Sequence, residues 1–211
     1  MNFIQRLKLA FDILFKIDVP VYLEHLKRKK RPIKIICVSG EAQNGKDTFA
    51  GLFQEGMKQK HPNKRVLVTH YADLLKYIAK AMFGWNGVKD EYGRTLLQRL
   101  GTDNIRKKCP NFWVVQVLWN LDLLSNEWDY VVIPDARFPN EIDACRNAGY
   151  ETIHVRVNRP DFDNGLTAEQ RQHPSETALN GYPVDIAVVN DGSINDLQNK
   201  VNDIIDSIVN D

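Results

Sequence analysis

The sequence predicts an α/β domain in which a parallel five-stranded sheet is flanked by helices. Three observations support this fold class. From residue 33 onward, short β-branched segments alternate with segments of helical periodicity. The strand candidates are apolar almost throughout, which is typical of strands buried on both faces of a parallel sheet. A glycine-bounded loop separates the first strand from the first helix of this region. At 211 residues the chain can hold one such domain with extensions.

The expected strands share runs of Val, Ile and Thr, and they cover residues 33–39, 65–70, 129–134, 151–157 and 184–189. The expected helices lie between and after them, near residues 45–60, 73–82, 92–101, 112–125, 138–148 and 194–209. Ser193 and Asp196 have the spacing of a capping box for the last helix. Residues 158–180 interrupt the alternation with prolines, glycine and many charges. We expect this segment to form a lid or a binding loop.

Residues 1–32 are expected to form a helical extension outside a main domain that covers residues 33–211. Apolar side chains recur at helical spacing between Phe3 and Phe15, and a basic run precedes Pro32. The simpler interpretation is a helix packed on the body or on a second subunit. An arm that binds a membrane surface or a nucleic acid is the alternative.

Charge and cysteine content favour a cytoplasmic protein without a membrane span. The net charge is +1, but residues 1–32 hold eight basic and three acidic residues, so the remainder carries −4. A slightly acidic body argues against stable nucleic-acid binding. Cys37, Cys109 and Cys145 are scattered without metal-ligand spacing, as expected for reduced thiols, two or more of them partly buried. No apolar run approaches the length of a membrane span, and the first sixteen residues are too charged for a secretion signal.

The most informative segment runs from Ile35 to Thr48. An apolar strand ends at Gly40, and Gly45 and Lys46 follow directly before a helix. This spacing lets backbone N–H groups surround a nucleotide polyphosphate, while the lysine supplies a charge for the β- and γ-phosphates. The fold is therefore expected to be of the P-loop NTPase type, with ATP as ligand. The position that usually holds Ser or Thr on Mg²⁺ is Asp47.

A second group of candidate residues follows the strand at 129–134. Asp135 comes at its C-terminal end, where the ligands of an open α/β sheet collect, and it can approach Mg²⁺. Arg137 lies two residues further on and could grip a phosphate bidentately. The alternative is an Asp–Arg ion pair that only fixes a turn.

Two further groups follow the second strand. Asp73 and Lys76 are one helical turn apart, so they either form a local ion pair or face an acceptor site. Residues 92–113 offer Gln98 for a base edge and Arg94 and Arg106 for a monophosphate. On residue types alone, these side chains could equally line a solvated helix face.

Five motifs in this order carry a resemblance to a known family: GKDT at 45–48, YADLLK at 71–76, RTLLQRLGTDNIR at 94–106, DARFPNE at 135–141 and HPSE at 173–176. Together, over roughly residues 33–209, the chain resembles the deoxynucleoside monophosphate kinases encoded by tailed phages, within the P-loop nucleoside monophosphate kinase superfamily. The resemblance implies ATP- and Mg²⁺-dependent transfer of the γ-phosphate to a (deoxy)nucleoside monophosphate for DNA precursor synthesis. It also implies a homodimer in the host cytoplasm. A kinase for another small phosphate, such as phosphomevalonate, and a P-loop ATPase or switch module are the alternatives.

The resemblance and the residue patterns together give a set of expected roles. The catalytic residues are expected to be Lys46, Asp135 and Arg137, and the metal ligands Asp47 and Asp135. The residues expected to bind ATP are Gly40, Gln43, Asn44, Gly45, Lys46, Asp47, Thr48, Arg156, Arg159 and Gly192. Those expected to bind the acceptor are Asp73, Lys76, Arg94, Gln98, Arg106, Trp113, Arg137, Glu141 and Glu176. Arg171 and His173 are further lid residues of interest.

Overall fold

The computed structural model describes residues 32–210, and the expected N-terminal helix and basic run lie outside them. The described residues form two compact units. One, here called the sheet unit, comprises residues 32–71 and 124–210. The other, the helical unit, comprises residues 72–123. No helix in the described part combines the length and the apolar character that crossing a bilayer requires.

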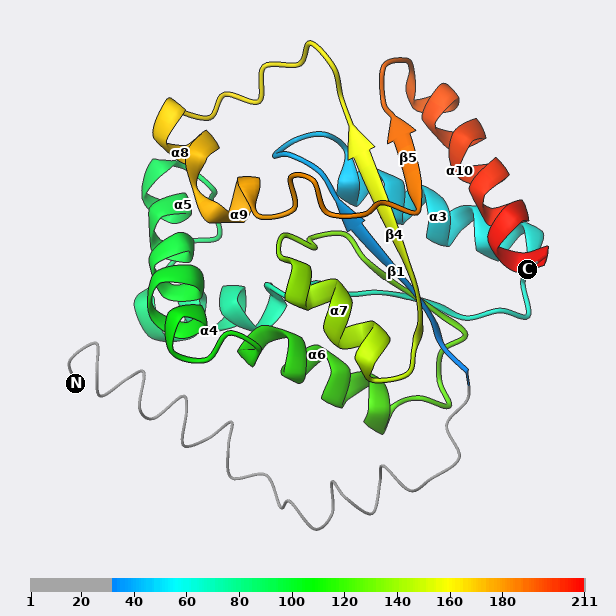
Figure 1. Cartoon of the computed structure of the whole chain (residues 1–211), viewed down its shortest axis with the longest axis horizontal. Helices are drawn as coiled ribbons and strands as arrows, with labels where there is room; N and C mark the ends of the chain where they lie inside the picture. The colour runs from blue at the N-terminus through cyan, green and yellow to red at the C-terminus, as the bar shows by residue number, and fades with distance from the viewer. Residues whose placement is uncertain (1–31, 211) are drawn as a thin grey trace. The chain divides into compact units, whose positions relative to one another are not determined.

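The sheet unit is built on five parallel strands in the order β2-β3-β1-β4-β5 (Figure 1). Their bounds are β1 Lys34–Ser39, β2 Val66–Val68, β3 Tyr130–Ile133, β4 Glu151–Asn158 and β5 Ile186–Val189. The predicted parallel sheet is confirmed by the register, in which Cys37 of β1 is paired with Ile133 of β3 and His154 of β4. The strands at the sheet edges are shorter than expected: β2 keeps three residues and β5 four.

Helices cover both faces of this sheet. The helices of the sheet unit are α3 Lys46–Lys60, α7 Pro139–Asn147 and α10 Ile194–Asn210, together with the short lid helices α8 Ala168–Gln172 and α9 Pro174–Thr177. On one face, α3 and α10 pack against each other and against the strands (Figure 1). Phe49, Phe53 and Ile205 bury their side chains there with Ile36 and Val155 of the central strands. This packing fixes the start of α3 directly beyond the C-terminal end of β1.

The capping box predicted for α10 is confirmed. The Ser193 backbone N–H donates to Asp196 Oδ2 at 2.8 Å, and the Asp196 N–H donates to Ser193 Oγ at 3.3 Å. These bonds satisfy two N–H groups that have no partner within the helix.

The expected lid, residues 158–180, is more structured than its composition suggests because it contains α8 and α9. Thr167 caps α8 by accepting a hydrogen bond from the Gln170 N–H at 3.2 Å. His173 caps α9 in the same way through Nδ1, which accepts from the Ser175 N–H at 3.2 Å, and Pro174 begins the helix as expected. Local capping thus orders a segment that has little apolar content.

The helical unit contains α4 Asp73–Phe83, α5 Glu91–Gln98, a π-helix η1 Arg99–Arg106 and α6 Phe112–Leu123. An α-helix was expected at 92–101, and the π-helix replaces its last turn. Side chains account for the wider turns, because Trp113 Nε1 donates to the Gly101 carbonyl at 3.1 Å and Asn104 Nδ2 to the Arg99 carbonyl at 2.6 Å. π-Helical turns are often found at functional sites.

Candidate functional site

The loop between β1 and α3 adopts backbone angles that only its sequence permits. Gly40 has a φ of +144° and Gly45 a φ of +96°. A Cβ added to Gly40 would lie 2.2 Å from the carbonyl oxygen of Val157, and one added to Gly45 would lie 2.6 Å from Asn190 Nδ2. The loop therefore passes so close to the ends of β4 and β5 that neither position can carry a side chain.

Amide side chains hold the loop in this position. Asn44 Nδ2 donates to the Val157 carbonyl at 3.3 Å, and Asn190 Nδ2 donates to the Asn44 carbonyl at 3.0 Å. From the lid side, Gln43 Nε2 donates to the carbonyl of the buried Asn164 at 2.9 Å. Gln43 and Asn44 thus use their side chains to shape the loop, and their contacts with phosphate stay a prediction.

Lys46 is the first residue of α3 and is almost fully buried, with 7% of its surface exposed. Its Nζ donates to the carbonyls of Gly40 at 2.7 Å and Glu41 at 2.6 Å, so the ammonium group lies inside the loop. The pKa of Lys46 is lowered from 10.5 to about 8, mainly by burial and in smaller part by the positive charge of Arg137. A cation held in this way is placed to meet an anion that enters the loop.

Three carboxylates oppose that pKa shift. The charges of Glu176, Asp47 and Asp135 each raise the pKa of Lys46. Together with Lys46 and Arg137, they form a cluster of two cations and three anions, here called the charge cluster, at the C-terminal ends of the strands. This edge is where an open α/β sheet binds its ligands.

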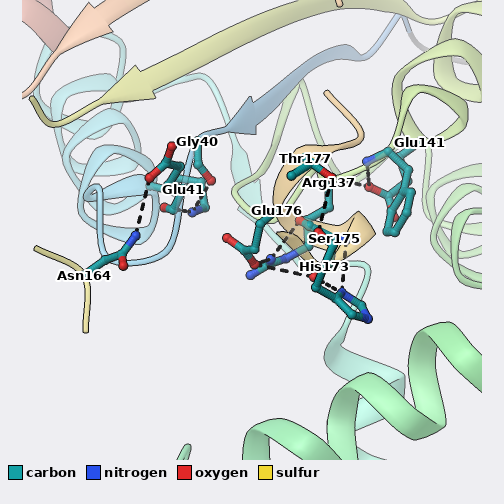
Figure 2. Close-up of polar contacts among 11 residues, drawn as sticks. Gly40, Glu41, Arg137, Glu141, Asn164, His173, Ser175, Glu176 and Thr177 are labelled. Carbon is teal, nitrogen blue, oxygen red and sulfur yellow. Dashed lines mark hydrogen bonds and ion pairs between the residues drawn. The ribbon is translucent and has the colours of Figure 1, made fainter. Parts of the chain in front are cut away.

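Asp135 and Arg137 follow β3 directly, as predicted. Asp135 Oδ1 accepts a hydrogen bond from the Tyr71 backbone N–H at 2.9 Å. Arg137 Nη1 forms an ion pair with Glu176 and also donates to the Ser175 carbonyl at 3.1 Å (Figure 2). The lid segment α9 therefore contacts the candidate phosphate-binding arginine through both a side chain and the backbone.

Glu141 stabilises the turn that carries Arg137. It is 1% exposed, and its Oε2 accepts hydrogen bonds from the backbone N–H groups of Arg137 at 2.6 Å and Phe138 at 3.0 Å. Tyr71 adds a bond from its hydroxyl to the Glu141 carbonyl at 2.7 Å. The Glu141 carboxylate thus shapes the backbone that carries Arg137, and direct contact with a substrate stays a prediction for this residue.

The metal ligands predicted for Mg²⁺ are chemically suited to it. Asp47 and Asp135 offer carboxylate oxygens, and Asp47 Oδ1 lies 2.8 Å from His70 Nε2. No group of three or more His, Cys, Asp or Glu ligands occurs in residues 32–210. This donor set fits Mg²⁺, which is usually bound through one or two carboxylates and completes its shell with substrate phosphates and water.

The predicted lid arginines are engaged within the sheet unit. Arg156 Nη1 donates to the Leu179 carbonyl at 2.9 Å, and Arg171 pairs with Asp163 at 2.8 Å. Arg159 stacks over the Phe162 ring at 3.9 Å from its centroid. Gly192 lies beside Asp196, where a Cβ would be 2.5 Å from the carboxylate. Their contacts with ATP stay predictions.

The remaining predicted acceptor residues lie in the helical unit. Asp73 and Lys76 form a local ion pair at 3.2 Å, which was one of the two alternatives, and their binding of the acceptor stays a prediction. Trp113 is 3% exposed and its indole N–H is bound to the Gly101 carbonyl, so it stabilises the core of this unit. Base reading by Trp113 and Gln98 stays a prediction.

Arg94 and Arg106 are held within the helical unit by backbone carbonyls. Arg94 Nε donates to the Lys89 carbonyl at 3.1 Å, and Arg106 Nη1 donates to the Pro110 carbonyl at 3.4 Å. Phosphate binding by either arginine stays a prediction.

The sequence interpretation missed several residues that shape the site. His70 lies just beyond the C-terminal end of β2. Asp135 was singled out because it follows the C-terminal end of a strand, and the same argument could have found His70. Tyr71 lies next to it. Asn164 and Asn190 carry no comparable signal, because single asparagines in a loop are common and their partners are distant in sequence.

The family model and two curated relatives carry the same family description. A profile of the family described as "Deoxynucleotide monophosphate kinase" matches residues 68–201. The deoxynucleotide monophosphate kinase of Enterobacteria phage T4 is 30% identical over 161 residues, covering 75% of this chain and 60% of the T4 protein. That of Escherichia phage RB69 is 30% identical over 123 residues, covering 57% of this chain and 48% of that protein. The chain therefore spans less than two thirds of either relative.

Among solved structures, the APS kinase of Mycobacterium tuberculosis in complex with AMPPNP and APS aligns with 84% of this chain and 99% of its own. The TM-score is 0.45 at 16% identity.

Proposed function

The chain belongs to the deoxynucleotide monophosphate kinase family, and on that premise we propose that it transfers the γ-phosphate of ATP to a (deoxy)nucleoside monophosphate. The product would be the corresponding diphosphate, a precursor for DNA synthesis. The observation that carries this proposal is the charge cluster. It brings the lysine of a phosphate-binding loop and a second cation, Arg137, to the same edge of the sheet. Two such cations can bind the phosphates of two substrates at the same time.

Lys46 and the loop N–H groups hold the β- and γ-phosphates of ATP in this proposal. Phosphoryl transfer requires little covalent help from the protein, and its rate depends on positioning and on neutralising charge at the transferred group. A buried ammonium group acts strongly here because the surroundings have a low dielectric constant.

Arg137 holds the phosphate of the acceptor. Its Nη1 is already bonded to α9, so the Nε and Nη2 donors, which neither of these bonds uses, can grip a phosphate bidentately. Glu141 fixes the backbone from which this side chain extends. Acceptor binding by Arg94, Gln98 and Arg106 of the helical unit is a separate part of this proposal.

Asp47 and Asp135 would hold Mg²⁺ together with the ATP phosphates. The ion, when bound, supplies positive charge at the phosphate oxygens. Asp135 is kept in place for this role by the Tyr71 N–H.

We further propose that residues 33–211 form the kinase domain with the lid, that residues 1–32 are an extension to it, and that the protein acts as a homodimer in the host cytoplasm without binding nucleic acid stably. Two of the relatives are phage proteins, which supports the proposed location in the host cytoplasm. The slightly acidic composition of residues 33–211 supports the proposal that the protein does not bind nucleic acid stably.

The test is to incubate the protein with Mg·ATP and each ribo- and deoxynucleoside monophosphate, and to separate the nucleotides by ion-exchange chromatography. We expect a diphosphate from one or a few acceptors. Hydrolysis of ATP without any diphosphate product would contradict the proposal.

A further inference from the structure

The carboxylate of Glu176 is buried and only half satisfied. Its side chain is 10% exposed, and one oxygen, Oε1, forms the ion pair with Arg137 Nη1. The other oxygen, Oε2, is fully buried and has no hydrogen-bond partner among the described residues. Buried polar atoms almost always have partners, so an acceptor left open in a candidate site calls for an explanation.

The position of Glu176 is set by the backbone rather than by its own flexibility. α9 is fixed at its start by the His173 cap on the Ser175 N–H and by Pro174. It is also fixed from the sheet, because Arg137 donates to the Ser175 carbonyl at 3.1 Å. The ion pair with Arg137 then holds the carboxylate itself in place.

The open oxygen belongs to the charge cluster. The Glu176 charge raises the pKa of Lys46, so the two groups are near each other. Figure 2 shows the Glu176 carboxylate between Arg137 and the loop residues Gly40 and Glu41. A molecule bound at this edge of the sheet can supply the donor that Oε2 lacks.

We propose that Glu176 Oε2 accepts a hydrogen bond from an O–H or N–H group of the acceptor nucleotide, which makes Glu176 a specificity-determining residue. The inference rests on the proposed function, because it takes the acceptor phosphate to lie on Arg137. The donor is either the 3′-hydroxyl of the sugar or an N–H of the base. Oε1 keeps Arg137 in place while Oε2 reads the nucleotide.

This arrangement makes a particular prediction for selectivity. A buried acceptor rejects an analogue that lacks the matching donor, because binding the analogue leaves the oxygen unpaired in a closed site. A phosphate alone gains nothing from Oε2, since it brings no donor.

The experiment compares three acceptors: the best natural nucleotide, its 3′-deoxy analogue, and an analogue whose base carries no N–H. The values of kcat/KM are measured for the wild type, Glu176→Gln and Glu169→Gln. Glutamine can still accept from Arg137 through one oxygen, but it places an NH₂ donor where Oε2 was. Glu169 is the matched control because it is an exposed carboxylate of the same lid, on α8.

We expect the wild type and Glu169→Gln to lose about 10- to 100-fold in kcat/KM on one of the two analogues. Which analogue loses identifies the donor as sugar or base. In Glu176→Gln the kcat/KM of the natural nucleotide should exceed that of this analogue by no more than about 3-fold, because the hydrogen-bond-accepting oxygen is gone. A ratio between substrates on one variant does not depend on how much of that variant is folded.

The inference is overturned if Glu176→Gln keeps the wild-type ratio, if the wild type accepts both analogues as well as the natural nucleotide, or if all acceptors lose equally in the variant. The last result would mean that Glu176 only positions Arg137. Failure of the proposed function would show differently, as a wild type that makes no diphosphate from any nucleotide.

Discussion

Lys46 combines burial with a position among several charged side chains. It is buried inside the loop it would serve, and it lies within range of three carboxylates and a second cation. Its ammonium group is therefore held against backbone carbonyls until an anion replaces them. Both its position and its titration can be tested.

Replacing Lys46 with alanine should lower kcat/KM for phosphoryl transfer by at least about 100-fold, because a preorganised charge at the transferred group is lost. The fold should persist, as the lost bonds are local. Steady-state assays and circular dichroism measure the two effects. Lys58→Ala removes an exposed lysine from the same helix and should change neither. A Lys46→Ala enzyme with near-normal turnover would exclude this role.

The pKa of Lys46 predicts how activity depends on pH. With a pKa of about 8 in the free protein, the ammonium charge is present below pH 8 and is lost as the pH rises above it. We expect kcat/KM for ATP, which reports on the free enzyme, to fall about tenfold per pH unit above roughly pH 8. Lys46→Arg should remove this alkaline decline, since arginine stays protonated. A decline that persists in this variant would assign it to another group.

At the scale of elements, the site depends on the two connections that follow β1 and β3. The first passes so close to the end of β4 that a Cβ at Gly40 would clash with it, and the second is a turn held by a buried carboxylate. Each connection holds one cation of the charge cluster, Lys46 after β1 and Arg137 after β3.

Gly40→Ala should displace the phosphate loop. The new Cβ would lie 2.2 Å from the Val157 carbonyl, and alanine disfavours a φ of +144°. We expect a loss of about 1–3 kcal/mol in the free energy of unfolding, measured in urea, together with loss of ATP binding. Gly51→Ala is the matched control in α3, where a Cβ meets nothing within 4 Å, and it should leave stability unchanged or raised by up to about 1 kcal/mol. Equal behaviour of the two variants would contradict the close approach of Gly40 to Val157.

Glu141→Ala should weaken both the start of α7 and the site. The backbone N–H groups of Arg137 and Phe138 would be left buried without their acceptor, at a cost of about 1–3 kcal/mol. Because the Arg137 backbone is then free to shift, kcat should fall as well. Asn147→Ala, an exposed change at the other end of α7, serves as the control. A variant with normal stability and normal kcat would show that the carboxylate is dispensable.

For the whole molecule, residue periodicity predicted the parallel sheet and the order of its strands and flanking helices along the chain. Strand β4 was placed within one residue of its observed end, and Asp135 and Arg137 follow β3 as expected. These features follow from burial on both faces of a parallel sheet, which leaves a direct trace in the residue types.

Features that depend on contacts between distant residues could not be predicted in this way. The π-helix at 99–106 arises because Trp113 takes the Gly101 carbonyl, and no local pattern encodes that bond. Acceptor binding by Glu141 stays a prediction, and its motif did not reveal that the carboxylate also accepts hydrogen bonds from the backbone of its own turn. The pairing of Arg137 with Glu176 joins residues 39 positions apart.

The most direct test of the proposed kinase activity follows the labelled phosphate itself. The protein is incubated with Mg·ATP labelled at the γ-position and with the accepted nucleoside monophosphate, and both nucleotide products are quantified. We predict that the label appears in the β-phosphate of the nucleoside diphosphate, with one ADP formed for each diphosphate. Label recovered only as inorganic phosphate would contradict the account.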